Sequence, residues 1–334
     1  MRIAVIGSGA IGCLVAGYLK FNGEDVILVA RPEAAKVINS DGLRITGVRG
    51  AQLVRVAAFD TSIPHPDLVI LATKIQDIEA AIKQHLNHIK NSIILTTENG
   101  IRADDIVAKF VPKDNILSSI VMFGATNLKN GEVVHNFEGS WIIGSMFGKH
   151  SQNAGIVANH LNKAFPTVVS EDIKGMKYTK VFVNSNNCIP GILGLSMQES
   201  FSDLEISRIS INIWKEGLGV VNKAGVKLVS LPDFPVERIT KLANMPSVEA
   251  AKIYAGIMGN LSKEPLYGSI LQSIKRGKKS EIDYINGEFV NLAEENGLNA
   301  PLNKKLVGMV HQVEKNGKFF SHEDFISQVR GLIH

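Results

Sequence analysis

Six residues near the start of the chain form a glycine-rich pattern that can hold phosphate groups. The sequence GSGAIG matches GxGxxG, follows the β-rich run RIAVI and opens a helical stretch, which is the context of a dinucleotide site. The first glycine allows a tight turn, the second lets the backbone approach a pyrophosphate, and the third allows close packing of helix and strand. The residues that we predict to bind a dinucleotide here are Gly7, Ser8, Gly9, Ala10, Ile11 and Gly12.

The end of the next strand indicates which dinucleotide binds. An NAD site usually places Asp or Glu there, where the carboxylate binds the ribose 2′-hydroxyl. Here the run DVILVA ends at Ala30 and Arg31, and Glu33 follows Pro32 in the next turn. The guanidinium of Arg31 can pair with a 2′-phosphate through its fork of donors. We therefore predict NADP as the cofactor, and the alternative for Arg31 is an ordinary surface arginine.

The elements that must position these residues alternate through the first half of the chain. Short apolar runs bounded by turn residues alternate with helical stretches, which indicates a parallel sheet covered on both faces. The runs are RIAVI, DVILVA, PDLVILAT, SIILTTENG and NILSSIVMFGAT. A later segment, GEVVHNFEGSWIIGS, is predicted to form a hairpin that extends the sheet.

Beyond about residue 171 the short Val/Ile-rich runs give way to long segments with helical periodicity. These segments are DIKGMKYTKVFVNSN, DLEISRISINIWKEGLGVVNKAG, VEAAKIYAGIMGNLS, SEIDYINGEFVNLAEENG and PLNKKLVGMVHQVEKNG. We predict an α/β fold with two domains, residues 1–170 for NADP binding and residues 171–334 for an all-helical substrate and catalytic domain. The join is expected near residues 166–175.

Composition excludes several other classes of protein. The 334 residues are 45% hydrophobic and 20% charged, with a formal net charge of +4, which is far from a nucleic-acid-binding profile. No apolar run approaches the roughly 20 residues of a membrane span. Cys13 and Cys188 suggest no disulfide framework, and Cys13 is expected to serve packing. The nine histidines show no metal-binding spacing, so we expect no metal. The cysteine usage, which fits a reducing cytosol, and the lack of a long apolar run predict a cytoplasmic location.

Four separated stretches together resemble the ketopantoate reductase (2-dehydropantoate 2-reductase) family. They are GSGAIG, LATKIQD, ENG, and YTKVFVNSN together with SILQSIKRGKKSEIDYING, in the family's order and spacing. The resemblance implies a Rossmann domain followed by a helical domain like that of 6-phosphogluconate dehydrogenase. It also implies reduction of a 2-keto acid by NADPH, which for ketopantoate gives pantoate on the route to pantothenate and coenzyme A.

The resemblance assigns the general acid to Lys180. Hydride addition to a ketone builds negative charge on the oxygen, and a cationic acid there stabilises that charge and donates the proton. Lys180 precedes the apolar run Val181 to Val183, where a lysine is costly unless it is partnered or functional. The family places Glu281 close to this lysine, where a carboxylate can orient it. Asp283 is predicted to point away from Glu281 on a helix, in a structural or solvated position.

Further site residues follow from the same resemblance. Lys74 and Asn99 are expected at the cofactor, and the residues expected at the substrate are Asn99, Asn184, Cys188 and Ser269. Two positions depart from the family: Cys188 replaces an asparagine whose role Asn187 could take, and Glu98 replaces His or Gln. The basic residues Arg276, Lys278 and Lys279 are expected on the surface.

Two other functions remain open at this point. One is a related D-2-hydroxyacid dehydrogenase that acts on other branched or aromatic 2-keto acids. The departure from the family at Cys188 leaves this alternative open. The other is a non-catalytic NADP-binding regulator, which would not need Lys180, Asn184, Ser269 and Glu281. The expected partner is a small 2-keto acid, with no nucleic acid or membrane, and a homodimer is left open.

Overall fold

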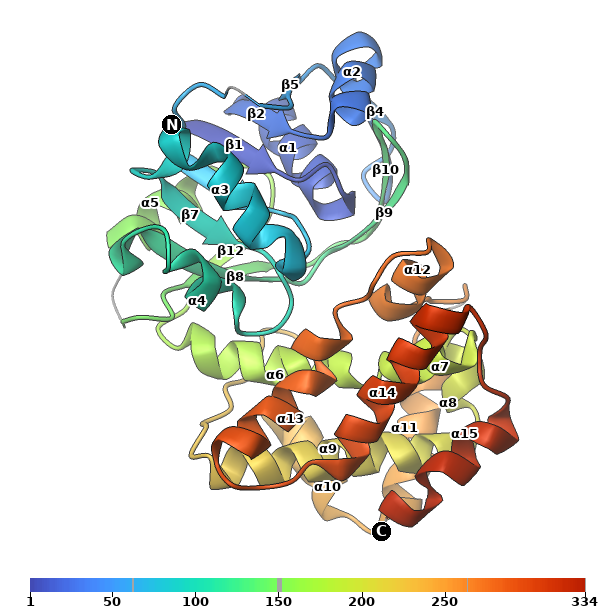
Figure 1. The fold of residues 1–334 in the computed structure, drawn as a ribbon. Helices are drawn as coiled ribbons and strands as arrows, with labels where there is room; N and C mark the ends of the chain where they lie inside the picture. Colours follow the sequence, from blue (N-terminus) through green and yellow to red (C-terminus); the bar gives the residue numbers. More distant parts are fainter. Residues whose placement is uncertain (62, 149–151, 263, 334) are drawn as a thin grey trace. The chain divides into compact units, whose positions relative to one another are not determined.

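The computed structural model describes residues 1–61, 63–148, 152–262 and 264–333, and the chain divides into two units. Unit 1 is Met1–Lys174 and unit 2 is Gly175–His334 (Figure 1). No helix within these described residues is both long enough and apolar enough to cross a membrane.

In the described part of unit 1, eight strands form the main sheet in the order β12-β11-β8-β7-β6-β1-β2-β5. All neighbours pair in parallel except β11, which runs antiparallel to β8. The strands are β1 (Arg2–Ile6), β2 (Asp25–Val29), β5 (Ala57–Phe59), β6 (Leu68–Leu71), β7 (Ile93–Thr96), β8 (Ile116–Val121), β11 (Trp141–Gly144) and β12 (Thr167–Val169). The predicted parallel sheet is confirmed, and the continuous burial of β6 explains its apolar run.

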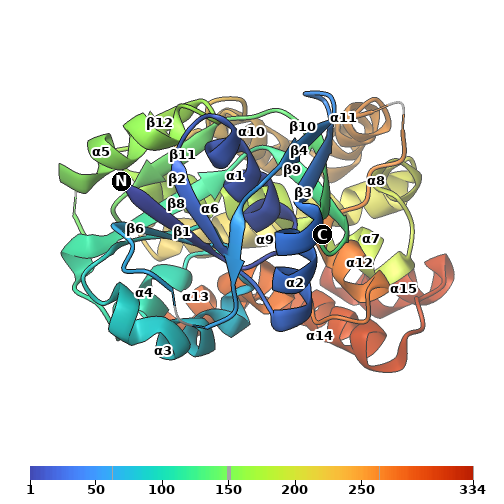
Figure 2. The same ribbon diagram turned by 90° about the horizontal axis from the view of Figure 1, so that it is seen from above.

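Helices cover both faces of the main sheet. Figure 2 shows α1 and α5 on one face and α3 and α4 on the other, as in a doubly wound fold. The helices of unit 1 are α1 (Ala10–Phe21), α2 (Pro32–Asp41), α3 (Ile78–Ile89), α4 (Ala103–Val107) and α5 (Gln152–Leu161), with short turns η1 (Ile75–Asp77) and η2 (Lys113–Asn115).

A second sheet of unit 1 corrects the predicted hairpin. Among the described residues it has the order β4-β3-β10-β9, with β3 (Leu43–Gly47), β4 (Gln52–Val54), β9 (Gly124–Lys129) and β10 (Glu132–Phe137). The hairpin prediction for GEVVHNFEGSWIIGS is wrong, because β10 pairs with β9 whereas β11 joins β8 in the main sheet. The physical difference lies in burial: β11 is buried on both faces, but β10 alternates between buried and exposed residues.

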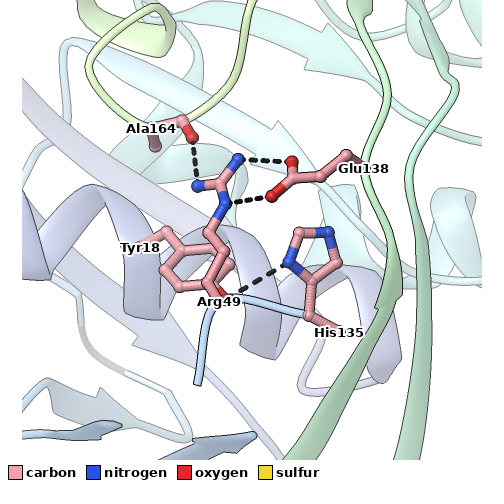
Figure 3. Close-up of polar contacts among 5 residues, drawn as sticks. All are labelled: Tyr18, Arg49, His135, Glu138 and Ala164. Atoms are coloured by element: carbon pink, nitrogen blue, oxygen red, sulfur yellow. Dashed lines mark hydrogen bonds and ion pairs between the residues drawn. The ribbon is translucent and has the colours of Figure 1, made fainter. Parts of the chain in front are cut away.

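An arginine clamp holds the second sheet against the rest of unit 1 (Figure 3). Arg49, in the turn between β3 and β4, donates to both carboxylate oxygens of Glu138 at 2.6 and 2.7 Å, and to the carbonyl of Ala164 at 2.7 Å. Its guanidinium carbon lies 4.7 Å from the ring centre of Tyr18 on α1. The Tyr18 hydroxyl lies 3.2 Å from Nδ1 of the buried His135 on β10. These contacts fix β3 and β10 onto α1.

Unit 2 is all-helical over its described residues, as predicted. The long helix α9 lies at its centre and contacts α10, α11, α13 and α14. The helices are α6 (Ile173–Ser185), α7 (Cys188–Leu193), α8 (Met197–Phe201), α9 (Leu204–Lys223), α10 (Val236–Asn244), α11 (Ser247–Gly259), α12 (Ser269–Lys275), α13 (Asn286–Glu295), α14 (Pro301–Asn316) and α15 (His322–Val329), with turns η3 (Ile282–Tyr284) and η4 (Arg330–Leu332).

The segment after α12 differs from the single helix predicted for SEIDYINGEFVNLAEENG. A short 3₁₀ turn, η3, is followed by α13, and Ile285 between them has φ −117° and ψ −88°, outside the helical region. Glu281 therefore precedes the turn η3 rather than lying within a long helix. The prediction of one continuous helix was wrong because hydrophobic spacing alone does not reveal a local break in backbone dihedrals.

Candidate active site

Four predicted site positions of unit 1 lie at one edge of the main sheet. The glycine-rich loop follows β1, Arg31 follows β2, Lys74 follows β6 and Asn99 follows β7. Because β2, β1, β6 and β7 are neighbours and parallel, their carboxyl ends meet at the same edge. Ligands of such sheets bind at this edge, where connections leave in opposite directions from adjacent strands.

The geometry of the glycine-rich loop fits a pyrophosphate. Gly7 has φ +115°, and a Cβ there would lie 2.5 Å from the carbonyl oxygen of Ala72. A Cβ at Gly12 would lie 1.8 Å from the carbonyl oxygen of Gly7, so strand and helix pack closely only without side chains. A Cβ at Gly9, in contrast, would meet no atom within 4 Å. The open side of the loop is thus at Gly9, directly before the N-terminus of α1, where backbone N–H groups attract phosphate.

Arg31 lies at the entrance of α2. It has extended dihedrals as the residue before Pro32, the first helical residue, and its side chain is exposed. Glu33 lies in the first turn of α2 rather than at the end of β2. The exposed guanidinium therefore follows the strand end at which an NAD site would carry an acid. Its contact with a 2′-phosphate stays a prediction.

Glu98 connects the two loops that carry Lys74 and Asn99. Its carboxylate is only 4% exposed; Oε2 accepts from the backbone N–H of Thr97 at 3.0 Å, and Oε1 lies 3.4 Å from the Thr73 hydroxyl. Gly100 has φ +83°, a left-handed conformation that glycine adopts without strain. The departure at Glu98 thus places a buried carboxylate between the loops after β6 and β7.

Helix α6 of unit 2 carries Lys180, and aromatic packing fixes its position. Phe182 packs on Phe289 of α13 with ring centres 4.7 Å apart, and its carbonyl accepts from Trp214 Nε1 at 2.9 Å. A Cβ at Gly217 of α9 would lie about 3 Å from both rings, so the glycine makes room for this pair. The Lys180 side chain is partly exposed, and burial lowers the pKa of its ammonium group to about 8.

A pKa near 8 suits a group that must give up a proton near neutral pH. At pH 7 such an ammonium group is still mostly protonated, and it releases its proton more readily than an ordinary lysine. The cause is desolvation, because removal from water disfavours the charged form. Asn184 lies one turn further along α6 and is also partly exposed, so it shares a helix face with Lys180.

The structure distinguishes between Asn187 and Cys188 by burial. Cys188 is 0% exposed, and burial raises the pKa of its thiol to about 12, against a smaller lowering by the Asn286 side chain. Asn187 is partly exposed and packs on Gly268, where a Cβ would lie 3.2 Å from Asn187 Cγ. Ser269, the first residue of α12, comes directly after Gly268. The structure thus brings Asn187, rather than the Cys188 thiol, next to the segment of Ser269.

The acidic pair after α12 separates by burial. Glu281 is 6% exposed, whereas the Asp283 side chain is 56% exposed and its carboxylate lies 3.1 Å from Nε2 of His311. The surface position of Asp283 agrees with the structural or solvated role predicted for it. The role of Glu281 beside Lys180 stays a prediction.

One buried residue near these positions escaped the sequence analysis. Asn286, the first residue of α13, is 0% exposed and donates to Asn303 Oδ1 at 2.9 Å. Asn303 in turn donates to Glu216 Oε1 at 2.8 Å, which ties α13, α14 and α9 together. The signal was present in the asparagine of EIDYING, but its polar type alone does not reveal burial.

The glycine-rich loop before α1 and the exposed Arg31 after β2 are groups of the kind that bind a dinucleotide. Within residues 1–61, 63–148, 152–262 and 264–333, no group of three or more His, Cys, Asp or Glu side chains could hold a metal ion. A glycine-rich loop at the carboxyl edge of a doubly wound parallel sheet, followed by a helical unit, defines a class of dinucleotide-binding proteins.

Comparison with known proteins identifies the family within this class. The family model described as Ketopantoate reductase PanE/ApbA matches residues 3–148, and that of its C-terminal part matches residues 172–314. The chain belongs to the ketopantoate reductase family and is an oxidoreductase.

Individual relatives cover nearly the whole chain. The 2-dehydropantoate 2-reductase of Pyrococcus abyssi is 31% identical over 314 residues, which cover 93% of this chain and 97% of the relative. A PanE/ApbA family ketopantoate reductase from Ralstonia eutropha has a similar fold, with a TM-score of 0.80, 24% identity and coverage of 94% and 99%. D-mandelate dehydrogenase with NADH and anilino(oxo)acetate has a TM-score of 0.82, 24% identity and the same coverage. These two structural likenesses bear on the fold alone.

Proposed function

We propose that this protein reduces 2-dehydropantoate to pantoate with NADPH. The observation that carries the proposal is its membership of the ketopantoate reductase family over nearly its whole length, with curated 2-dehydropantoate 2-reductases among the relatives. The site agrees with it, because Lys180, the acid expected from the family motif, has a pKa of about 8. The family uses NADPH.

Unit 1 holds the cofactor in this proposal. The loop from Gly7 to Gly12 cradles the pyrophosphate, with Gly9 on the open side. Arg31 pairs with the 2′-phosphate, and the absence of an acid at the end of β2 removes the repulsion that the phosphate would otherwise meet. Lys74 and Asn99 lie at the ends of β6 and β7, where they reach the nicotinamide side of the cofactor.

Unit 2 supplies the acid and the substrate contacts. Bound NADPH supplies the hydride that C2 of the keto acid receives, and the Lys180 ammonium group gives its proton to the ketone oxygen. The product is a 2-hydroxy acid, and Lys180 is left neutral until it takes a proton from solvent. Glu281 orients Lys180, while Asn184 and Ser269 bind the substrate, and Asn187 replaces the contact that Cys188 would make in the family register.

The two domains have separate tasks in this proposal. Residues 1–170 bind NADP, and residues 171–334 bind the substrate and supply the acid. We place the reaction in the cytoplasm. The oligomeric state in this proposal is a homodimer. Light scattering should then give a molar mass in solution that is twice that of the 36.3 kDa chain.

The experiment that tests the function is NADPH oxidation with a panel of keto acids. Initial rates with ketopantoate, 2-ketoisovalerate and phenylpyruvate are compared, each with NADPH and with NADH. The proposal expects the highest kcat/KM for ketopantoate with NADPH. A preference for phenylpyruvate would instead identify a D-2-hydroxyacid dehydrogenase, and no turnover despite NADPH binding would identify a non-catalytic NADP-binding protein.

A further inference from the structure

The carbonyl group of Ser8, inside the glycine-rich loop, accepts two side-chain hydrogen bonds. The thiol of Cys13 lies 3.3 Å from this oxygen, and the side-chain amide of Asn127 donates to it at 3.3 Å. A carbonyl oxygen has two lone pairs, so both donors can be satisfied at once. The two donors come from different elements, because Cys13 lies on α1 and Asn127 lies on β9 of the second sheet.

The position of Asn127 in its sheet shows that its side chain faces α1. Asn127 pairs across the ladder with Val133, and Ala125 pairs with His135. Partners directly opposite each other point to the same face, and Val133 and His135 are 1% and 0% exposed. The helix α1 packs against β9 and β10. Asn127 therefore places an amide on the inner face of the sheet, where burial favours an apolar side chain.

Cys13 is suited to remain a donor. It is 0% exposed, and burial raises the pKa of its thiol to about 12. At neutral pH the sulfur thus keeps its proton, which it can give to the Ser8 carbonyl. The sequence analysis expected a packing role for Cys13, and the structure adds this polar contact.

We propose that Asn127 and Cys13 are positioning residues that hold the Ser8 carbonyl and so fix the glycine-rich loop in its pyrophosphate-binding conformation. This inference rests on the proposed use of NADPH. With the Ser8 carbonyl held by α1 and β9, the adjacent Gly9 stays open, since a Cβ there would meet no atom within 4 Å. The second sheet of unit 1 thereby takes part in cofactor binding, although its strands stand outside the main sheet.

The test separates loop positioning from general stability by comparing two cofactors. Dissociation constants for NADPH and NADH are measured by fluorescence titration for wild type, Asn127→Leu and Asn127→Ala. Leucine has the same branched skeleton as asparagine and suits an inner sheet face, so Asn127→Leu removes the donor without opening a cavity, and Asn127→Ala removes it without adding bulk. The loss of one hydrogen bond predicts about 3- to 10-fold weaker binding of both cofactors. Their affinity ratio stays unchanged, because the pyrophosphate is common to both.

The matched control is Asn136→Ala. Asn136 lies on β10 and donates to the hydroxyl of Thr126 on β9 at 2.9 Å, on the outer face of the same two strands. This substitution removes a hydrogen bond of the same sheet without touching the loop, so cofactor affinity should equal that of wild type. Cys13→Ala should weaken the binding of both cofactors as Asn127→Leu does. Cys13→Ser keeps a donor and should retain most of the wild-type affinity.

Three results would overturn the inference. Unchanged dissociation constants in Asn127→Leu, even with a lower melting temperature, would reduce Asn127 to a packing residue. A change in the NADPH to NADH ratio would assign its effect to the 2′-phosphate end. If wild type itself bound no NADPH, the proposed function would fall together with the inference, whereas tight binding by wild type and both Asn127 variants would refute only the positioning role.

Discussion

The lowered pKa of Lys180 predicts the pH dependence of the reduction. An acid with a pKa of about 8 loses its proton above that pH, so kcat/KM for the keto acid should be level below pH 8 and fall tenfold per unit above it. Between about pH 7 and pH 9 the protonated fraction changes from roughly nine-tenths to one-tenth, a tenfold loss of rate. An ordinary lysine, with a pKa of about 10.4, would show almost no loss over this range.

Initial rates measured from about pH 6 to 10, with saturating NADPH, decide between these cases. Lys180→Arg provides the first comparison, because a guanidinium does not titrate here and the residual rate should be level throughout. The control is Lys174→Ala, which removes an exposed lysine from the same helix and should keep the break near pH 8. Lys180→Ala should lower turnover by roughly 10²- to 10⁴-fold. A wild-type profile that is level to pH 10, or that rises with pH, would refute the role of Lys180 as the acid.

Three further predictions follow from the site and from the Arg49 clamp. Arg31→Ala should erase most of the preference for NADPH, about tenfold or more by titration of both cofactors; equal wild-type affinities would contradict this. Glu281→Ala should lower turnover roughly 10- to 100-fold. In the double variant with Lys180→Ala the two losses of turnover should not multiply, because the pair acts as a unit. Asp283→Ala should cost about 1 kcal/mol of stability or less and leave turnover unchanged. Arg49→Ala should lower the free energy of unfolding by only about 1 kcal/mol at pH 7, because the partner Glu138 is half exposed and water screens the ion pair; denaturant titration measures this loss. The Arg49 guanidinium lowers the pKa of that partner, the Glu138 carboxyl, so the difference should shrink as pH falls below about 4; a constant difference would contradict an ionic contribution.

The main sheet was predictable because its strands are buried on both faces. Turn residues bound each of the apolar runs that form β1, β2, β6, β7 and β8. This pattern predicts a parallel sheet. The strands β4, β5 and β12 have three residues each, too few for alternation to appear in the sequence. The same limit explains the wrong hairpin, because local patterns do not say which distant strand is the partner.

Motifs predicted candidate site residues, and their positions in the fold are what the structure adds. Motifs placed Gly7, Arg31, Lys74 and Asn99 after four strands, and the structure brings those strand ends together. The contacts of Asn127 could not be predicted, because the residue it touches is 119 positions away. The two departures from the family were visible in the sequence, but their surroundings were not. The buried Glu98 carboxylate links two loops. Cys188 is buried as well, so Asn187, which lies next to Gly268, is the better candidate for the substrate contact.

The clamp between Arg49 and Glu138 has a consequence for how the protein is made. The two residues are 89 positions apart, so the segment between them must fold back before the second sheet can close. Contacts between distant residues form slowly, because the entropy of the intervening chain is lost before the contact is gained. During synthesis, the glycine-rich loop leaves the ribosome long before β9 and β10 do. A nascent chain that ends before Glu138 should thus bind NADPH weakly, and affinity for the cofactor should emerge only late in translation.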